Sequence, residues 1–124
     1  MIARADRLRN GSDFERTRAR GRAWSAPLLV AVVLANELGR NRYGFAAGKR
    51  VGGAVERNRA KRLLREAVRA QHPRLRPGHD IVFIARNALT PATSFSVVGE
   101  QVENVLRRAG LFNPETSQNG ADAA

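Results

Sequence analysis

Runs of apolar residues along the chain predict three β-strands. In residues 27–35 the apolar side chains fall on both alternating faces, as expected for a strand that is covered on both sides. Residues 42–47 form a second predicted strand, which we expect to pair with the first as a hairpin. Residues 79–86 form a third. Because a helical segment separates the second strand from the third, the pattern indicates a crossover unit in which the third strand lies parallel to an earlier one.

Apolar residues at helical spacing predict three helices around these strands. The first covers about residues 13–20, because Ser12 and Glu15 have the form of a capping box and Gly21 can close the helix. The third covers about residues 95–109. The middle helix is the longest, and its charge pattern sets it apart from the other two.

The middle helix, predicted over residues 54–71 and ending before Pro73, carries much like charge. One stripe is apolar and can pack on a sheet; it consists of Ala60, Leu63, Leu64, Ala67 and Val68. The opposite side is formed by Arg57, Lys61, Arg62, Arg65 and Arg69 with Asn58. Arg57, Lys61 and Arg65 stand one helical turn apart in succession, where like charges repel and modestly destabilise the helix.

The composition places most of the positive charge in the same part of the chain. The sequence has 22 Lys+Arg against 11 Asp+Glu, a formal net charge of +11, and a pI near 11.7. Residues 1–76 hold 19 cations and 6 anions, a balance of +13, whereas residues 77–124 hold 3 and 5, a balance of −2. All but two of the cations are arginines, whose planar guanidinium binds phosphate with two parallel hydrogen bonds. This surplus predicts a polyanionic partner, whose phosphates would relieve the repulsion on the helix.

Nucleic acid is the polyanion that the pattern favours, although composition alone does not separate RNA from DNA. Lys49 and Arg50, flanked by glycines, bring two more cations and exposed amides to the N-terminus of the middle helix, a natural anion site. No helix-turn-helix pair or heptad zipper accompanies that helix, so a sheet with aromatic positions beside it better suits single-stranded nucleic acid. The candidates for base stacking are Phe14, Trp24, Tyr43 and Phe45. Core packing is the commoner role for each of them, and Phe14 has the fewest apolar neighbours in the sequence.

The composition also argues against several other classes of protein. The chain has no cysteine, so disulfide frameworks and thiolate chemistry are excluded. No apolar run approaches the roughly 20 residues of a membrane span, and the N-terminus lacks the apolar stretch of a secretory signal, so we expect a cytoplasmic protein without a membrane partner. The carboxylates are scattered, and His72 and His79 flank a turn. We therefore expect no catalytic residue and no metal site in the protein itself.

The segment that begins Arg57-Asn58-Arg59 and continues through Lys61-Arg62 to Arg65-Glu66 resembles the RNR motif of the protein-subunit family of bacterial ribonuclease P. Further matches follow the family order: Leu8-Arg9, Asp13-Phe14, Gly21-Arg22, Gly44-Phe45, Lys49-Arg50-Val51-Gly52, Ala54-Val55, Gly78-His79-Asp80-Ile81-Val82 and Ile84-Ala85-Arg86. Together they cover roughly residues 8–110, and the RNxxKRxxRE pattern with these flanks is highly specific.

This resemblance implies a two-layer α/β sandwich with the element order α-β-β-β-α-β-α, the ribosomal protein S5 domain 2-like fold. The β-α-β crossover around the basic helix is left-handed in that fold, whereas the general rule for such units predicts a right-handed one. The implied organisation is a single RNA-binding domain over residues 1–112. Residues 113–124 have no apolar pattern, and we expect them to form a disordered C-terminal tail.

The resemblance also implies a function as the protein component of ribonuclease P. Such a protein binds the catalytic RNA subunit and the single-stranded 5′ leader of precursor tRNA, and it promotes endonucleolytic removal of the leader. The RNA supplies the active site and binds most of the Mg²⁺, and the protein is expected to be monomeric apart from RNA. The implied contacts with the RNA subunit are Lys49, Arg50, Arg57, Asn58, Arg59, Lys61, Arg62, Arg65 and Arg69. The implied leader cleft consists of Phe14, Arg18, Val30, Val32 and Ala46.

The sequence departs from the family pattern at two cleft positions. Arg18 and Val32 stand where some members carry aromatic residues, so we expect weaker base stacking and a larger share of backbone contacts. Two alternatives stay open at this point. One is a non-catalytic RNA-binding protein, such as a ribosomal protein or an RNA chaperone, that uses the same basic helix. The other is a metal-dependent nuclease that cuts RNA without an RNA subunit.

Overall fold

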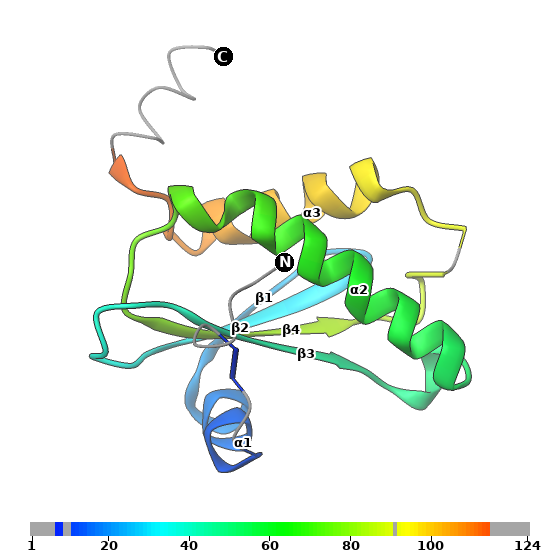
Figure 1. Ribbon diagram of the computed structural model, residues 1–124, viewed down its shortest axis with the longest axis horizontal. Coiled ribbons are helices and arrows are strands. Elements are labelled where there is room, and N and C mark those ends of the chain that lie inside the picture. The colour runs from blue at the N-terminus through cyan, green and yellow to red at the C-terminus, as the bar shows by residue number, and fades with distance from the viewer. Residues whose placement is uncertain (1–6, 9–10, 91, 115–124) are drawn as a thin grey trace.

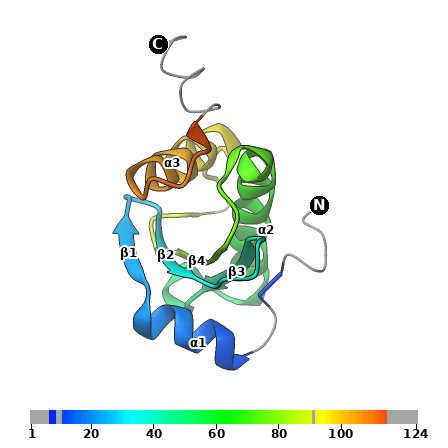
Figure 2. The same ribbon diagram turned by 90° about the vertical axis from the view of Figure 1, so that its left-hand side faces the viewer.

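A four-stranded sheet lies at the centre of the molecule, with helices on both of its faces (Figure 1). The computed structural model describes residues 7–8, 11–90 and 92–114. The elements are α1 (Gly11–Arg20), β1 (Arg22–Ser25), β2 (Leu29–Ala35), β3 (Arg42–Ala47), the 3₁₀ helix η2 (Lys49–Val51), α2 (Ala54–Gln71), the 3₁₀ helix η3 (His72–Arg74), β4 (His79–Ala85) and α3 (Phe95–Arg108). Helices α2 and α3 form a layer on one face of the sheet, and α1 lies on the other (Figure 2). This α/β architecture and its element order confirm the expected fold class.

The strand order in the sheet is β1-β2-β4-β3. β2 pairs antiparallel with β1 and with β4, while β3 pairs parallel with β4. The predicted hairpin between residues 27–35 and 42–47 is therefore wrong, because β4 lies between β2 and β3. Three successive residues of β4, Ile81 to Phe83, are completely buried, and an apolar strand of this kind is best placed at the centre of a sheet.

The connection from β3 through α2 to β4 is a left-handed crossover. Both strands run from left to right in Figure 1 and hence away from the viewer in Figure 2. In Figure 2, β3 lies to the right of β4 and α2 lies above the two strands, so the path turns counter-clockwise as it recedes. The expectation taken from the family is thus correct, and the general right-handed preference does not apply to this unit.

Local sequence signals place some boundaries better than others. α2 has the predicted bounds, and β3 does as well. α1 begins at Gly11, so Ser12 lies inside the first turn and does not precede the helix. Residues 49–51, which lie between the flanking glycines, form the short helix η2. The periodicity gave no strand at β1, where only Trp24 is partly buried.

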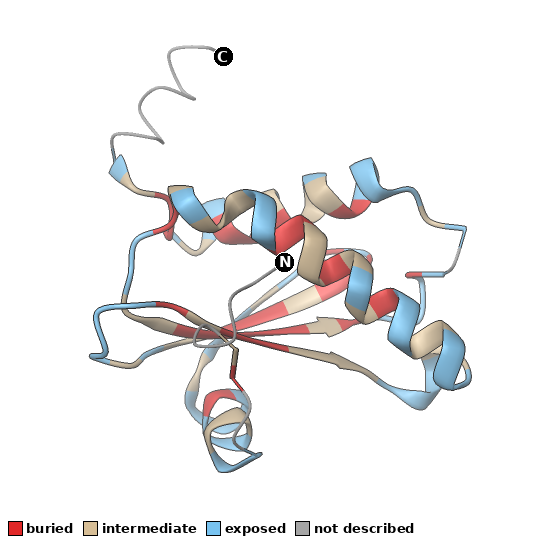
Figure 3. Ribbon diagram, in the orientation of Figure 1, coloured by how far each residue is buried: buried red, intermediate tan, exposed pale blue. Residues whose placement is uncertain are grey.

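The hydrophobic core lies between the sheet and the α2–α3 layer. Alternate residues of the central strands face it, and on α2 the buried residues are Ala60, Leu64, Ala67 and Val68 (Figure 3). Leu63 is only partly buried at the edge of this cluster. Burying Leu64 stabilises the fold by roughly 1.5–3 kcal/mol, whereas each like-charge pair along the helix opposes it by only about 0.2–0.5 kcal/mol. Packing therefore holds α2 in place despite its charge.

Two expectations fall partly outside the described residues. Arg9 is one of them, and residues 115–124 of the predicted tail are the other. Asn113, the first residue of that predicted tail, donates a backbone hydrogen bond of 2.7 Å to the Arg74 carbonyl. Position 113 therefore contacts the folded part of the chain.

Candidate nucleic-acid interface

The face of α2 that points away from the sheet carries cations with few neutralising partners. Asn58, Arg59 and Arg62 are exposed. Within the part of the chain that the structure describes, one α2 cation forms an ion pair, between Arg69 and Glu66 at 3.1 Å. The predicted surplus of positive charge is therefore present on this surface, and it is not cancelled by the protein's own carboxylates.

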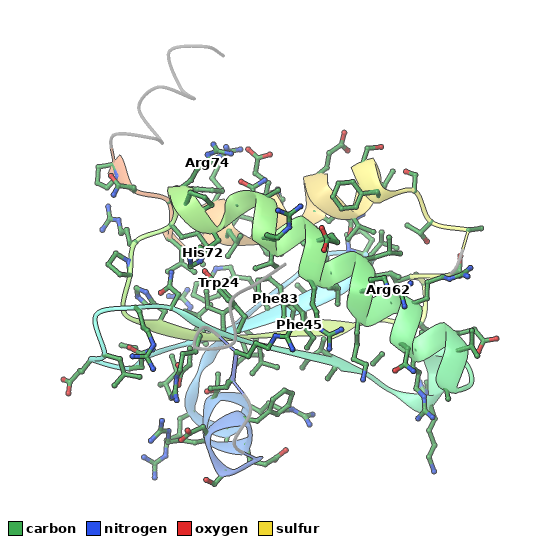
Figure 4. All side chains as sticks on the ribbon, viewed as in Figure 1. Trp24, Phe45, Arg62, His72, Arg74 and Phe83 are labelled. Atoms are coloured by element: carbon green, nitrogen blue, oxygen red, sulfur yellow. The ribbon has the colours of Figure 1, made fainter. Side chains whose placement is uncertain are left out.

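Arg65 on α2 reaches a ring of the sheet. Its guanidinium carbon is 5.5 Å from the centroid of the Phe45 ring on β3, and Phe45 in turn stacks on Phe83 with 5.8 Å between ring centroids. Figure 4 shows both rings beneath α2. Burial, together with the nearby charges of Arg7 and Arg62, lowers the pKa of Arg65 from its ordinary value. Arg65 therefore sits at a point where positive charges converge.

The N-terminus of α2 is partly occupied by the chain itself. Gly52 has a φ of 142°, and a Cβ placed there would lie 2.8 Å from the Glu56 Cβ. A Cβ on Gly53 would lie 3.2 Å from Glu56 Oε2. The Glu56 carboxylate thus lies against the first turn, where a negative charge complements the helix dipole. Lys49 and Arg50 on η2 stay exposed beside it, so the anion-binding potential of this end lies with these two cations.

A hollow of about 380 Å³ adjoins η2 at the carboxyl ends of the parallel strands β3 and β4. Its lining consists of Gly48, Lys49, Arg50, Val51, Ile84, Ala85, Arg86 and Asn87. The expected site residues Lys49 and Arg50 are therefore joined here by Arg86 and Asn87, which the sequence reasoning did not assign. The sequence could have indicated Arg86. It directly follows the third predicted strand, and the carboxyl ends of parallel neighbouring strands lie at the same edge of a sheet.

On the opposite face of the sheet, Phe14 of α1 packs directly on Gly44 of β3. A Cβ placed on Gly44 would lie 2.8 and 2.9 Å from two Phe14 ring atoms, so this contact requires a glycine. Phe14 itself is half-buried. Its ring therefore lies on the sheet with part of its surface accessible.

The remaining expected cleft residues divide into open and covered positions. Val30, Ile84 and Ala46 are register partners across β2, β4 and β3, and all three are half-buried, forming an accessible apolar row. Val32 is only 6% exposed, because the end of α1 lies over it. Arg18 is exposed and lies 3.8 Å from Glu15 on the same helix. The structure thus brings Phe14, Val30 and Ala46 to one accessible face, where Val32 is covered by the end of α1.

A buried ionic network attaches α1 to the sheet. Asp80 on β4 is completely buried and accepts hydrogen bonds from Arg42 Nε at 2.8 Å and Nη2 at 2.7 Å. Arg42 also reaches Asp13 on α1 at 3.3 Å. Arg16 lies 3.3 Å from Asp13 and 3.7 Å from Asp80, and the Asn36 amide donates to Asp80 at 2.8 Å. This network holds the helix that carries Phe14.

The network fixes the charge states of its central pair. Burial would raise the pKa of Asp80, but hydrogen bonds from Arg42 and Asn36 and the charges of Arg42 and Arg16 outweigh it, so that pKa is lowered. The hydrogen bonds that Arg42 donates to Asp80 are the main cause that raises the pKa of Arg42. Asp80 is therefore ionised at neutral pH and neutralises the arginines around it.

The other aromatic candidates are engaged in the fold. Tyr43 is buried, and its hydroxyl lies 2.6 Å from His72 Nδ1. Trp24 is half-buried, with the Arg22 guanidinium carbon 4.9 Å from its ring centroid. Among the four candidates, Phe14 is the one placed on the α1 face beside the accessible apolar row.

The described residues contain neither a metal-binding cluster nor a membrane-spanning helix. No group of three or more His, Asp or Glu side chains within residues 7–8, 11–90 and 92–114 is arranged to hold a metal ion. Across the same residues, no helix has both the length and the apolar character to cross a membrane.

The left-handed α/β fold and its unneutralised arginine helix define a small basic protein of the RNA-binding class. Comparison with known proteins gives the family. The family model described as Ribonuclease P matches residues 2–110. Relatives include the ribonuclease P protein components of Roseiflexus sp. (strain RS-1), 42% identical with 94% of this chain and 95% of the relative covered, and of Symbiobacterium thermophilum, 44% identical with 92% and 99% covered.

Solved structures agree with the sequence matches. The RNase P protein of Staphylococcus aureus superposes with a TM-score of 0.76 at 30% identity, covering 89% of this chain and all of that one. The protein from Thermotoga maritima gives a TM-score of 0.75 at 30% identity, covering 82% and 96%. The chain belongs to the ribonuclease P protein family. It is accordingly a subunit of ribonuclease P, a partner of the RNase P RNA, and acts in 5′ processing of tRNA.

Proposed function

We propose that α2 and η2 form the surface that binds the RNase P RNA, and that this RNA supplies the active site. The single observation that carries the proposal is the cationic face of α2, where Arg69 with Glu66 is the one ion pair formed among the described residues. RNA phosphates would complete this surface and release counterions. The residues proposed for this contact are Lys49, Arg50, Arg57, Asn58, Arg59, Lys61, Arg62, Arg65 and Arg69.

The α1 face is the proposed binding place for the 5′ leader of precursor tRNA. Phe14 can stack with a base, and the apolar row of Val30, Ile84 and Ala46 continues the surface beside it. Arg18 is exposed on α1 and could contact the leader backbone, while Val32 is covered by the end of α1 on the same face of the sheet. Single-stranded nucleic acid binds such surfaces by stacking on aromatic rings while cations follow its phosphates.

The contribution of the protein to catalysis is electrostatic in this proposal. Its net positive charge screens the repulsion between RNase P RNA and precursor tRNA, which tightens substrate binding and strengthens the hold of the RNA on Mg²⁺. The RNA binds most of that Mg²⁺. We further propose that the protein is monomeric apart from RNA and works in the cytoplasm.

A cleavage assay at low Mg²⁺ tests the proposal. The purified protein is added to RNase P RNA with 5′-leader-bearing precursor tRNA, and the site and rate of cleavage are measured. We expect cleavage at the correct 5′ position only when both the RNA and the protein are present. Failure to rescue cleavage would favour the RNA-chaperone alternative, and cutting by the protein without the RNA would favour an autonomous nuclease.

A further inference from the structure

The N-terminal segment brings one more cation to the edge of β3. Arg7 forms a parallel bridge with Tyr43, and the Leu8 amide donates a 2.7 Å hydrogen bond to the Tyr43 carbonyl. This bridge extends the sheet by one short segment on the side where α2 carries Arg65. Arg7 was not among the residues expected to bind RNA.

Arg62 and Arg65 of α2 carry two more positive charges near this edge. Arg65 lies over the Phe45 ring at 5.5 Å, and the charges of Arg7 and Arg62 both act on it, after burial, to lower its pKa. None of the three forms an ion pair within the described residues. Arg7 Nε is also buried there without a hydrogen-bond partner. The cluster therefore combines like-charge repulsion with an unsatisfied donor.

Both features are unfavourable in the protein on its own. A buried donor without a partner costs about 1–3 kcal/mol, and more when it belongs to a charged group. Charges of one sign that lie close together and away from water raise this further. A group with several acceptor oxygens and negative charge removes both penalties at once, and phosphate matches the planar fork of arginine.

We propose that Arg7, Arg62 and Arg65 together bind a single backbone phosphate of the RNase P RNA, at a site that joins the N-terminal segment to α2. The site rests on the proposed function, because it continues the same cationic surface through Arg62, which is exposed on α2 (Figure 4). It adds a specific point at which the start of the chain and the basic helix share one phosphate.

The first test is the salt dependence of binding to RNase P RNA. Arg7→Gln removes one of the three cations at this phosphate, so the log–log slope of affinity against salt should fall, by at most the roughly 0.7–0.9 of one whole phosphate contact. Arg40→Gln is the matched control, since it makes the same change in charge at an exposed loop position. An Arg7→Gln slope equal to that of the Arg40 control would overturn the site.

A double-mutant cycle tests whether the phosphate is shared. If Arg7 and Arg65 bind the same phosphate, the fold-loss of the Arg7→Gln/Arg65→Gln pair should be clearly smaller than the product of the two single losses. Arg7→Gln combined with Arg57→Gln should be multiplicative, because Arg57 lies about 12 Å farther along the helix. Multiplicative losses for both pairs would contradict a common phosphate.

Further measurements separate the rival explanations of the Arg7→Gln result. The Tm of RNA-free Arg7→Gln should not fall, because removing the charge relieves repulsion; a clear fall would make Arg7 structural and overturn the proposal. Inorganic phosphate that shifts the Arg7 Nε signal while the RNA slope stays unchanged would indicate a free-anion site, also against it. If Arg7→Gln weakens binding only of leader-bearing precursor tRNA, the phosphate belongs to the leader, and the proposal of an RNase P RNA phosphate is overturned. Wild-type protein that fails to bind RNase P RNA at all would instead refute the proposed function.

Discussion

The two faces of the sheet use arginine in opposite ways. On the α1 face, Arg42 and Arg16 lie within ion-pair distance of Asp13 and Asp80, and Asp80 is fully buried. On the α2 face, the described cations have only the Arg69–Glu66 pair. Both regions are rich in the same residue type, so a count of cations does not locate a nucleic-acid interface. The position of the carboxylates, which neutralise one set of arginines and not the other, does locate it.

This difference separates the energetic roles of the two regions. The network under α1 should set the stability of the fold and the position of Phe14, with little influence on the salt dependence of RNA binding. The α2 surface should set the salt dependence with little influence on stability. Variants on each side can test that separation directly.

The largest expected effect is on stability, at the buried pair. Asp80→Ala leaves Arg42, whose side chain is 17% exposed, without its main partner, and the free energy of unfolding should fall by about 3–5 kcal/mol. Urea unfolding measures the change. A double variant, Arg42→Met with Asp80→Leu, removes both charges and should recover part of the loss. A loss below about 1 kcal/mol for Asp80→Ala would mean that the network is not what secures α1.

The next effect concerns the leader. Phe14→Ala should weaken the binding of leader-bearing precursor tRNA by the holoenzyme by about 1–3 kcal/mol, the usual contribution of one stacked base, and should weaken mature tRNA far less. Affinity measurements on both RNAs give the comparison. Phe95→Ala, which changes an aromatic residue that is 48% exposed on α3, is the control and should affect neither. Equal losses on the two RNAs would place Phe14 in a purely structural role.

A smaller effect is expected for the pair Arg57→Ala and Arg65→Ala. Loss of these phosphate contacts should flatten the log–log salt dependence of RNase P RNA binding by about one unit or somewhat more. Binding is measured over a series of salt concentrations. The pair Arg20→Ala and Arg40→Ala removes the same charge outside α2 and should change the slope less. Identical slopes for the two pairs would show that the α2 surface has no special part in the contact.

The smallest effect is expected on lowering the pH. The pKa of Asp80 is lower in the folded protein, so its contribution is fully present above the unfolded value near 3.9 and is lost as the pH falls through the folded value. The Tm should therefore drop below about pH 4 more steeply in the wild type than in Asp80→Asn. Parallel curves for the two proteins would show that Asp80 does not contribute to the acid sensitivity.

Features set by local sequence were predictable, and those set by distant partners were not. The α2 bounds follow from helical periodicity and from Pro73, which lies just beyond the helix end. The contact between Arg42 and Asp80 joins residues 38 positions apart, and no local pattern marks it. The same holds for Arg7, whose place beside Tyr43 depends on the completed sheet.

The sheet order was mispredicted for a related reason. A short loop between two apolar runs normally gives a hairpin, which is why the sequence predicts pairing between residues 27–35 and 42–47. The burial of β4 overrides this preference, because its position between them covers both of its edges and both of its faces. β1 was missed because a four-residue edge strand with three exposed side chains has no alternation to detect. The family resemblance supplied the additional strand, which is β1, and the left-handed crossover.

Because Gly44 has no side chain, the residue types allowed at positions 14 and 44 depend on each other. The Phe14 ring occupies the space that any larger residue at position 44 would need, so a methyl group there would lift the aromatic ring away from β3. A change at position 44 would consequently behave in a cleavage assay like a substrate-recognition defect, although the glycine itself offers a nucleotide almost nothing to touch. Sequence drift at the two positions should be correlated, with residues larger than glycine at 44 tolerated only where a smaller side chain replaces the ring.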